Sequence, residues 1–316
     1  MRWQAFLLLA AALLGCASSP EVDPRYRPAE SVLEVLAVLQ RHVPDDTYRF
    51  PAAHDFTGRN VYRSSLLRLE NLERLHADAL RAGHMDGVIA FGKARALERL
   101  GAFDLAAESY RLAADRDAEL ADEALYGAGV CDELDRAGAL TLGTGDTRSI
   151  ADGIEIASPE TVIARFEERA AALGALADRV EGSHYAPVVR EAQERADVER
   201  AAWFVRARAF VPDGDLRAVA EMQRVVTQHG RSARAPRHML ALADLYARLS
   251  SEYAGKHPPE SLHFDPAEFR DLVDSSARLY EMVAARDGTP EKIEATRKLE
   301  AFLAFALSVD RDRFTP

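Results

Sequence analysis

The sequence predicts an all-α protein built from consecutive helical hairpins. From about residue 30 onward, apolar residues recur at intervals of three and four, which is the period of a helix that buries one face. No segment alternates apolar and polar residues as a half-buried strand does. The periodic segments are short and are separated by turns of a few residues, so we expect antiparallel helical neighbours.

The first sixteen residues differ from the rest of the chain. Residues 1–4 carry one positive side chain, residues 5–14 are an unbroken apolar run, and Cys16 follows. Ten apolar residues make a helix of about 15 Å, roughly half the thickness of the hydrocarbon layer of a bilayer. The segment is therefore too short to span a membrane and is typical of a secretory signal.

The end of this segment, Leu13-Leu14-Gly15-Cys16, resembles the lipobox of bacterial lipoproteins. The resemblance implies cleavage before Cys16 and lipidation of Cys16 on its sulfur and its amino group. Several acyl chains anchor a protein stably, whereas one chain binds only marginally. Ala17 resembles the residue found after Cys in lipoproteins sorted to the outer membrane. We therefore expect a lipid-anchored outer-membrane protein that faces the periplasm. The alternative is an ordinary signal peptide followed by a chance cysteine.

The chain after the signal segment divides into four parts. Residues 16–29 contain three prolines and predict a partly extended tether. Residues 30–136 and 159–316 predict two helical sub-arrays. Between them, residues 137–158 are rich in glycine and form either a mobile loop or a joint between the sub-arrays.

Within the sub-arrays, periodicity and helix-boundary residues predict each helix in turn. Ser158-Pro159 and Asp265-Pro266 predict helix starts, with an N-cap side chain followed by proline at the first helical position. The expected helices cover residues 31–43, 60–82, 86–99, 104–115, 118–136, 159–180, 185–211 and 216–228, with three more that begin near residues 236, 265 and 290.

Two of these helices, covering residues 86–99 and 104–115, place small and aromatic residues in a characteristic order together with the turn between them. The residues are Ala94, Leu97, Gly101, Ala106, Tyr110 and Ala113. This order resembles the tetratricopeptide repeat (TPR), although Ala118 stands where that family often has proline. The resemblance implies a right-handed α-solenoid of TPR-like helical hairpins with a concave surface. Ala277, Tyr280 and Val283 repeat the order with a shorter first gap.

A second segment extends the resemblance. The helix 216–228, the turn 229–232, Ala235-Pro236 and the run 242–246 resemble TPR-type outer-membrane lipoproteins, including the barrel-assembly lipoprotein family. The resemblance implies a scaffold that binds one or more envelope or outer-membrane proteins. A peptide or helix of the partner would lie along the inner face of the solenoid.

Composition excludes several other function classes. The formal net charge of −11 argues against nucleic-acid binding, which needs a basic surface to neutralise phosphates. With Cys16 lipidated, Cys131 has no cysteine partner, and its helical surroundings favour a buried, inert thiol over a reactive one. The nine histidines lack the spacing of a zinc site. We expect no metal and no cofactor.

Two sequence features come close to enzyme motifs, and only the second, together with the expected compartment, supports an alternative of enzymatic activity. Residues 87–94 approach the P-loop spacing but lack the Ser or Thr that would hold magnesium, and they are apolar and helical. Glu108-Ser109 and Glu260-Ser261 resemble the catalytic Glu-Ser of lytic transglycosylases, which also carry helical superhelices, but neither is followed by the rest of that motif. A cell-wall-acting enzyme, or its helical accessory module, is thus the alternative to a scaffold without catalytic activity.

The one candidate binding surface in the sequence is aromatic and basic. Trp203 and Phe204, followed by Arg206 and Arg208, are candidates for a ridge that contacts a partner protein. The alternative is that the aromatic pair packs in the core while the arginines lie on a solvated helix face.

Overall fold

A computed structural model describes residues 27–45, 61–140 and 158–312 of the chain. Every regular element in these three ranges is an α-helix, eleven in all, and no strand occurs among them, which confirms the predicted all-α class. The expected signal segment and Cys16 lie outside the described residues, as do most of the expected tether and of the glycine-rich segment. The chain divides into two compact units, residues 1–132 and 133–316, which are described separately.

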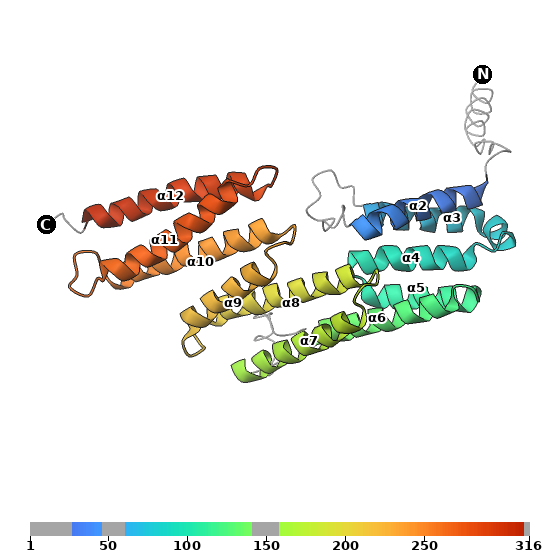
Figure 1. Ribbon diagram of the computed structural model, residues 1–316, viewed down its shortest axis with the longest axis horizontal. Coiled ribbons are helices and arrows are strands. Elements are labelled where there is room, and N and C mark those ends of the chain that lie inside the picture. The colour runs from blue at the N-terminus through green and yellow to red at the C-terminus, as the bar shows by residue number, and fades with distance from the viewer. Residues whose placement is uncertain (1–26, 46–60, 141–157, 313–316) are drawn as a thin grey trace, which may run out of the picture. The chain divides into compact units, whose positions relative to one another are not determined.

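In unit 1 each helix from α2 to α5 packs against the next, and α6 shares the core of α4 and α5 (Figure 1). Its helices are α2 (Pro28–Asp45), α3 (Val61–Ala82), α4 (Asp86–Leu100), α5 (Phe103–Arg116) and the first part of α6 (Ala121–Ala139), which crosses the division after Asp132. The turn between α4 and α5 is tight because Gly101 adopts φ 78° and closes the helix with a hydrogen bond from its N–H to the Glu98 carbonyl.

The core of unit 1 depends on small residues. Gly92 lets α4 approach α2, since a Cβ there would lie 2.5 Å from Cδ2 of Leu36. Between α4 and α5, Ala94 and Ala106 are fully buried, and the ring of Tyr110 fills the remaining space. That ring meets Phe91 edge-on, with centroids 5.3 Å apart.

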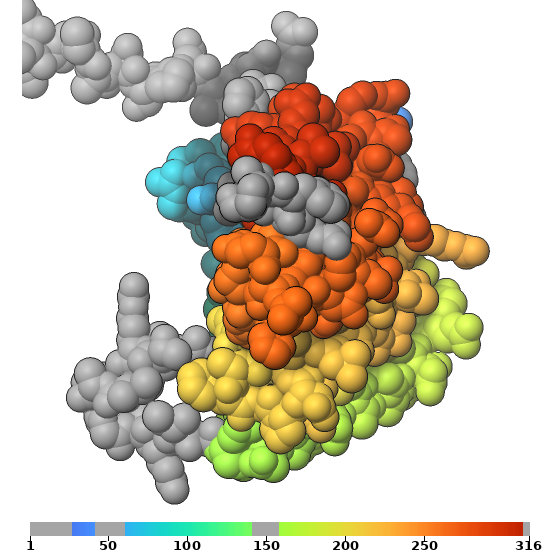
Figure 2. Space-filling model, turned by 90° about the vertical axis from the view of Figure 1, so that its left-hand side faces the viewer, coloured from blue at the N-terminus to red at the C-terminus, as the bar shows by residue number. Residues whose placement is uncertain are grey.

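Unit 2 continues the pattern of sequential packing. Its complete helices are α7 (Pro159–Arg179), α8 (Ala186–Ala207), α9 (Gly214–Gln228), α10 (Ala235–Lys256), α11 (Pro266–Ala284) and α12 (Glu291–Asp312). Each helix packs on the one that follows it, and α12 also contacts α10. Figure 2 views one end of this unit, where the colours follow the chain order from α7 to α12.

Two helix starts predicted from sequence are confirmed. Ser158 caps α7, and its hydroxyl oxygen accepts a hydrogen bond from the N–H of Thr161 at 3.3 Å. Asp265 caps α11 in the same manner, accepting from the N–H of Ala267 at 2.8 Å. In both helices proline follows the cap, where its missing N–H costs no intrahelical bond.

Some predicted boundaries are wrong. Helix α8 ends at Ala207 and not at residue 211, because the chain turns there through a bond from the N–H of Phe210 to the Ala207 carbonyl at 2.8 Å. Helix α6 runs to Ala139 and so enters the expected glycine-rich segment. Helix α2 begins at Pro28, within the expected tether. Helix α3 is interrupted at His76, whose φ of −130° and ψ of 27° are not helical.

Candidate functional site

The structure corrects the predicted aromatic ridge. Trp203 and Phe204 are only 8% and 4% exposed and belong to the main core of unit 2, where Trp203 packs against Phe166. Arg208 forms ion pairs with Asp215, at 2.9 Å, and with Glu252. Arg206 alone of the four candidates is well exposed, so the set does not form a binding ridge.

The residues considered for catalysis are dispersed. Glu108 lies exposed in the middle of α5 in unit 1, and Glu260 lies exposed in the turn before α11 in unit 2. Residues 87–94 form the first half of α4, so their glycine spacing belongs to a helix and not to a phosphate-binding loop.

The most extensive polar arrangement is a row of charged residues on α8. Glu191, Glu194, Asp197 and Arg200 follow one another at intervals of three. Residues three apart lie on neighbouring parts of a helix surface, and this row faces α9, α10 and the turn between them. The side chains of the row are at most about a fifth exposed.

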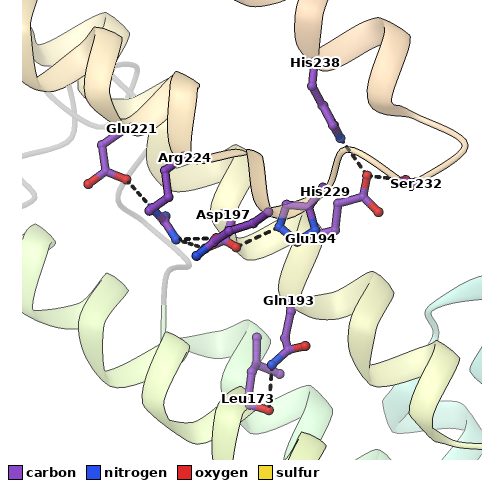
Figure 3. A network of polar contacts seen from close by, with 10 residues as sticks. Leu173, Gln193, Glu194, Asp197, Glu221, Arg224, His229, Ser232 and His238 are labelled. Atoms are coloured by element: carbon purple, nitrogen blue, oxygen red, sulfur yellow. Dashed lines mark hydrogen bonds and ion pairs between the residues drawn. The ribbon is translucent and has the colours of Figure 1, made fainter. Parts of the chain in front are cut away.

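The first half of the row binds the start of α10. Glu191 pairs with Arg234 at 2.6 Å. Glu194 accepts a hydrogen bond from the hydroxyl of Ser232 at 2.7 Å, and its same oxygen lies 2.6 Å from Nε2 of His238 (Figure 3). Both Glu194 and His238 are buried, so these contacts satisfy polar groups that water does not reach.

The second half of the row binds the end of α9. Asp197 contacts Nε2 of His229 at 2.9 Å and Nη1 of Arg224 at 2.8 Å (Figure 3). Glu221 then pairs with both Arg224, at 3.0 Å, and Arg200, at 2.8 Å. We call the whole set the α8 network: Glu191, Glu194, Asp197, Arg200, Glu221, Arg224, His229, Ser232, Arg234 and His238.

The surroundings stabilise the ionised form of both central carboxylates. Burial by itself would raise the pKa of Glu194, but the hydrogen bonds from His238 and Ser232 outweigh it, so the pKa is lowered. Burial likewise opposes ionisation of Asp197, whose pKa is nevertheless lowered by His229 and Arg224. Both side chains therefore carry a negative charge at neutral pH and are matched by positive or donating groups.

The contacts indicate what the α8 network does. Each central carboxylate is already occupied by two donors, and the described ranges hold no group of three or more His, Cys, Asp or Glu that could bind a metal ion. The network therefore holds the α9–α10 turn against α8. Sequence reasoning missed it, although the spacing of three along α8, together with the Arg and His residues of 229–238, was a usable signal.

Unit 1 contains a second unusual group, the buried carboxyl of Glu98 on α4. It accepts a hydrogen bond from the Tyr110 hydroxyl at 2.5 Å, and Arg95 lies 3.9 Å away. Burial raises the pKa of Glu98 to about 7, against the opposing effects of Arg95, Tyr110 and Arg99. Burial also raises the pKa of the nearby Cys131 thiol, so this thiol stays protonated at neutral pH.

None of the helices in the described ranges is long and apolar enough to cross a bilayer. Comparison of the chain with protein-family models, with curated proteins and with solved structures found no match.

Proposed function

We propose that this protein is a lipid-anchored scaffold of TPR-like helical hairpins that binds another protein of the bacterial envelope and catalyses no reaction. The observation that carries the proposal is the packing of α4 against α5. Ala94, Ala106 and Ala113 are completely buried, and so is Tyr110. These are the positions at which the TPR resemblance requires small and aromatic residues, because they allow two helices to approach closely.

The lipobox-like residues 13–16 and Ala17 support anchoring to the outer membrane, with the helical body in the periplasm. These residues lie outside the described ranges, so the support comes from the sequence alone. Replacing Cys16→Ser is expected to release the protein from membranes while its helical circular dichroism stays the same. Continued membrane association of this variant would contradict the lipid anchor.

The binding face that fits this proposal lies on α4 and α6. Arg95 of α4 bonds to Glu123 of α6 at 3.4 Å, and its guanidinium lies 5.0 Å from the centre of the Phe91 ring. Tyr126 follows Glu123 by three residues on the same side of α6 and is 42% exposed. An exposed aromatic side chain next to an ordered charged pair is what the apolar face of a partner helix would bury.

The test is crosslinking and affinity purification of the protein from its own membranes, with the bound proteins identified by mass spectrometry. Tyr126→Ala is expected to lose the specific partner. Leu105→Ala, which alters a similarly exposed apolar side chain on α5 (49%), is the matched control and should retain it. Equal recovery of the same envelope proteins with both variants would reject the α4–α6 face. Recovery of no specific protein by the unaltered chain would reject the scaffold.

A direct test of the enzymatic alternative uses the two Glu-Ser pairs. Glu108→Gln and Glu260→Gln, alone and together, are expected to leave the turnover of the cell wall unchanged. Both carboxylates are exposed, so neither change should unfold the protein. A fall in wall turnover with a normally folded variant would favour an enzyme.

A further inference from the structure

Four exposed arginines are chain neighbours of members of the α8 network. Arg190, Arg195, Arg231 and Arg237 are all exposed. Each is the immediate chain neighbour of a network member: Glu191, Glu194, Ser232 and His238, respectively. The network contacts hold the beginnings of α8 and α10 and the α9–α10 turn together, so the four arginines lie on one part of unit 2. We call them the basic corner.

The basic corner carries an excess of positive charge that other groups do not neutralise. Residues 183–195 and 227–239 contain only two acids, Glu191 and Glu194. Both face inward, where Arg234 and His238 hold them. Arg190, Arg231 and Arg237 form no ion pair with another described residue, and Arg195 reaches Glu191 only at 4.0 Å. The outward charge is thus positive in a chain whose net charge is −11.

The character of the corner favours a diffuse anionic surface over a protein partner. Protein interfaces are centred on buried aromatic or apolar anchors. The large exposed apolar side chains described in unit 2 all lie elsewhere, at Phe210, Leu216, Leu262, Met282, Ile293, Leu303 and Leu307. A surface of phospholipid head groups needs only accessible positive charge, and the affinity rises with each Lys or Arg near the membrane.

We propose that the basic corner docks on a membrane surface that contains anionic phospholipid. This orientation of unit 2 is separate from the proposed partner binding, which uses unit 1. The acidic remainder of the surface would be repelled by the same lipids, so the body would meet the membrane through this corner. Each arginine contributes roughly a fivefold increase in partition to an anionic surface, and removing three of them is expected to weaken docking about a hundredfold.

The test measures the distance between the corner and the membrane in the full-length chain. A fluorophore is attached through Ala233→Cys, an exposed position in the α9–α10 turn, in a Cys16→Ser background; Cys131 is buried and does not compete for the label. Energy transfer to a labelled lipid is compared on vesicles of phosphatidylcholine with and without phosphatidylglycerol. The Cys16→Ser chain carries no lipid anchor, so energy transfer requires docking, and the difference between the two kinds of vesicle reports on it.

We expect strong energy transfer at residue 233 only with phosphatidylglycerol, and its loss in high salt. The triple change Arg190→Gln, Arg231→Gln and Arg237→Gln should abolish it. The matched change Arg217→Gln, Arg248→Gln and Arg270→Gln, at exposed arginines elsewhere in unit 2, should not. A label at Ala209, beyond the opposite end of α8, should stay distant. Equal melting temperatures would show that both triple variants are folded.

Two results would overturn the proposal. One is the same energy transfer on both kinds of vesicle, or an equal effect of the two triple variants. The other is a change in the fluorescence of the label at residue 233 when polyglutamate is added but not when phosphatidylglycerol is present. That result would assign the basic corner to an acidic protein.

Discussion

Glu98 is a carboxyl group whose burial opposes its charge. Its side chain is completely buried between α4 and α5, with a hydrogen bond from Tyr110. In the folded chain the pKa of Glu98 is about 7, against 4.5 for an ordinary glutamate. Between these two pH values the folded state binds more protons than the unfolded state. The stabilising effect of the neutral carboxyl is therefore fully present below pH 4.5 and is lost as the pH rises through 7.

Replacing Glu98→Gln should remove this pH dependence, because the amide keeps the shape of the protonated acid. Between about pH 5 and about pH 8, the free energy of unfolding of the unaltered chain should fall by about 3 kcal/mol more than that of the variant. Urea unfolding at the two pH values measures the difference. Equal pH slopes for the two proteins would contradict the buried, titrating carboxyl.

Single residues are also where sequence reasoning reached its limit. Trp203 and Phe204 lie in a helix whose charged residues are spread around its circumference, so the sequence alone left both a surface ridge and a core position open. The structure places them in the core because α9 and α10 supply the apolar side chains that cover them. Glu98 gave no signal of burial, since a glutamate within a helix ordinarily faces water.

At the scale of elements, the α8–α9 turn depends on the absence of a side chain at Gly214. A Cβ at this position would lie 1.9 Å from the carbonyl oxygen of Arg208, and the backbone on both sides is held by the turn. By contrast, Gly174 in the middle of α7 has no atom within 4 Å of where its Cβ would be. The two glycines therefore predict opposite effects of the same substitution.

Gly214→Ala is expected to destabilise the protein by about 2 kcal/mol or more, because the clash is with backbone and can be relieved only by opening the turn. Gly174→Ala, the matched control, should stabilise the protein by about 0.5–1 kcal/mol through its higher helix propensity. Thermal and urea unfolding of both variants measure these changes. A neutral Gly214→Ala would show that the close approach to Arg208 is not required.

The same turn explains why helices were easier to predict than their ends. The recurrence of apolar residues at intervals of three and four predicted all eleven described helices, because it reflects burial of one face along the whole helix. The period continues past Ala207 through Val211, yet α8 stops because packing of α9 requires the chain to reverse. Where a cap side chain acts locally, as at Ser158 and Asp265, the sequence located the boundary correctly.

At the scale of the whole molecule, the two units should respond to pH in opposite directions. Unit 1 contains Glu98, whose raised pKa makes acidification from pH 7 to 4.5 stabilising. Unit 2 contains Glu194 and Asp197, whose pKa values are lowered by their partners. Their contribution is present above the ordinary values of 4.5 and 3.8 and is lost as the pH falls through the folded-state pKa values.

Each unit contains a natural reporter with which to measure this. Cys131 is buried in unit 1, so its reactivity toward a thiol reagent follows opening of that unit; Trp203 is buried in unit 2, so its fluorescence follows the other. The experiment uses a Cys16→Ser and Trp3→Phe background. The urea concentration at the midpoint of unfolding, measured at Cys131, should decrease as the pH is raised from about 5 to about 8. The midpoint measured at Trp203 should decrease only when the pH is lowered below about 4. The reaction rate of the thiol is divided by the rate for the unfolded chain at the same pH. Midpoints that coincide at every pH would contradict independent responses of the two units.

The pairing within the α8 network could not be derived from the sequence for a reason that operates at this scale. The α8 residues of the network lie between 21 and 44 residues from their partners in the chain, and pairing over such distances is decided by how α9 and α10 return to α8. The sequence could offer the acids at intervals of three, but not the residues that would meet them. The buried alanines of α4 and α5 could be foreseen because the contacting helices are joined by a turn of two residues.

The spacing of the α8 network also has a consequence for ancestry. An acid at 191 is meaningful only with a base at 234, and an acid at 194 only with the donors at 232 and 238, so a change at one member should be inherited together with a compensating change at its partner. Apolar core positions accept many side chains and lose their resemblance quickly. This pairing rule should therefore outlast overall identity, and it offers a way to recognise distant descendants of the same hairpins.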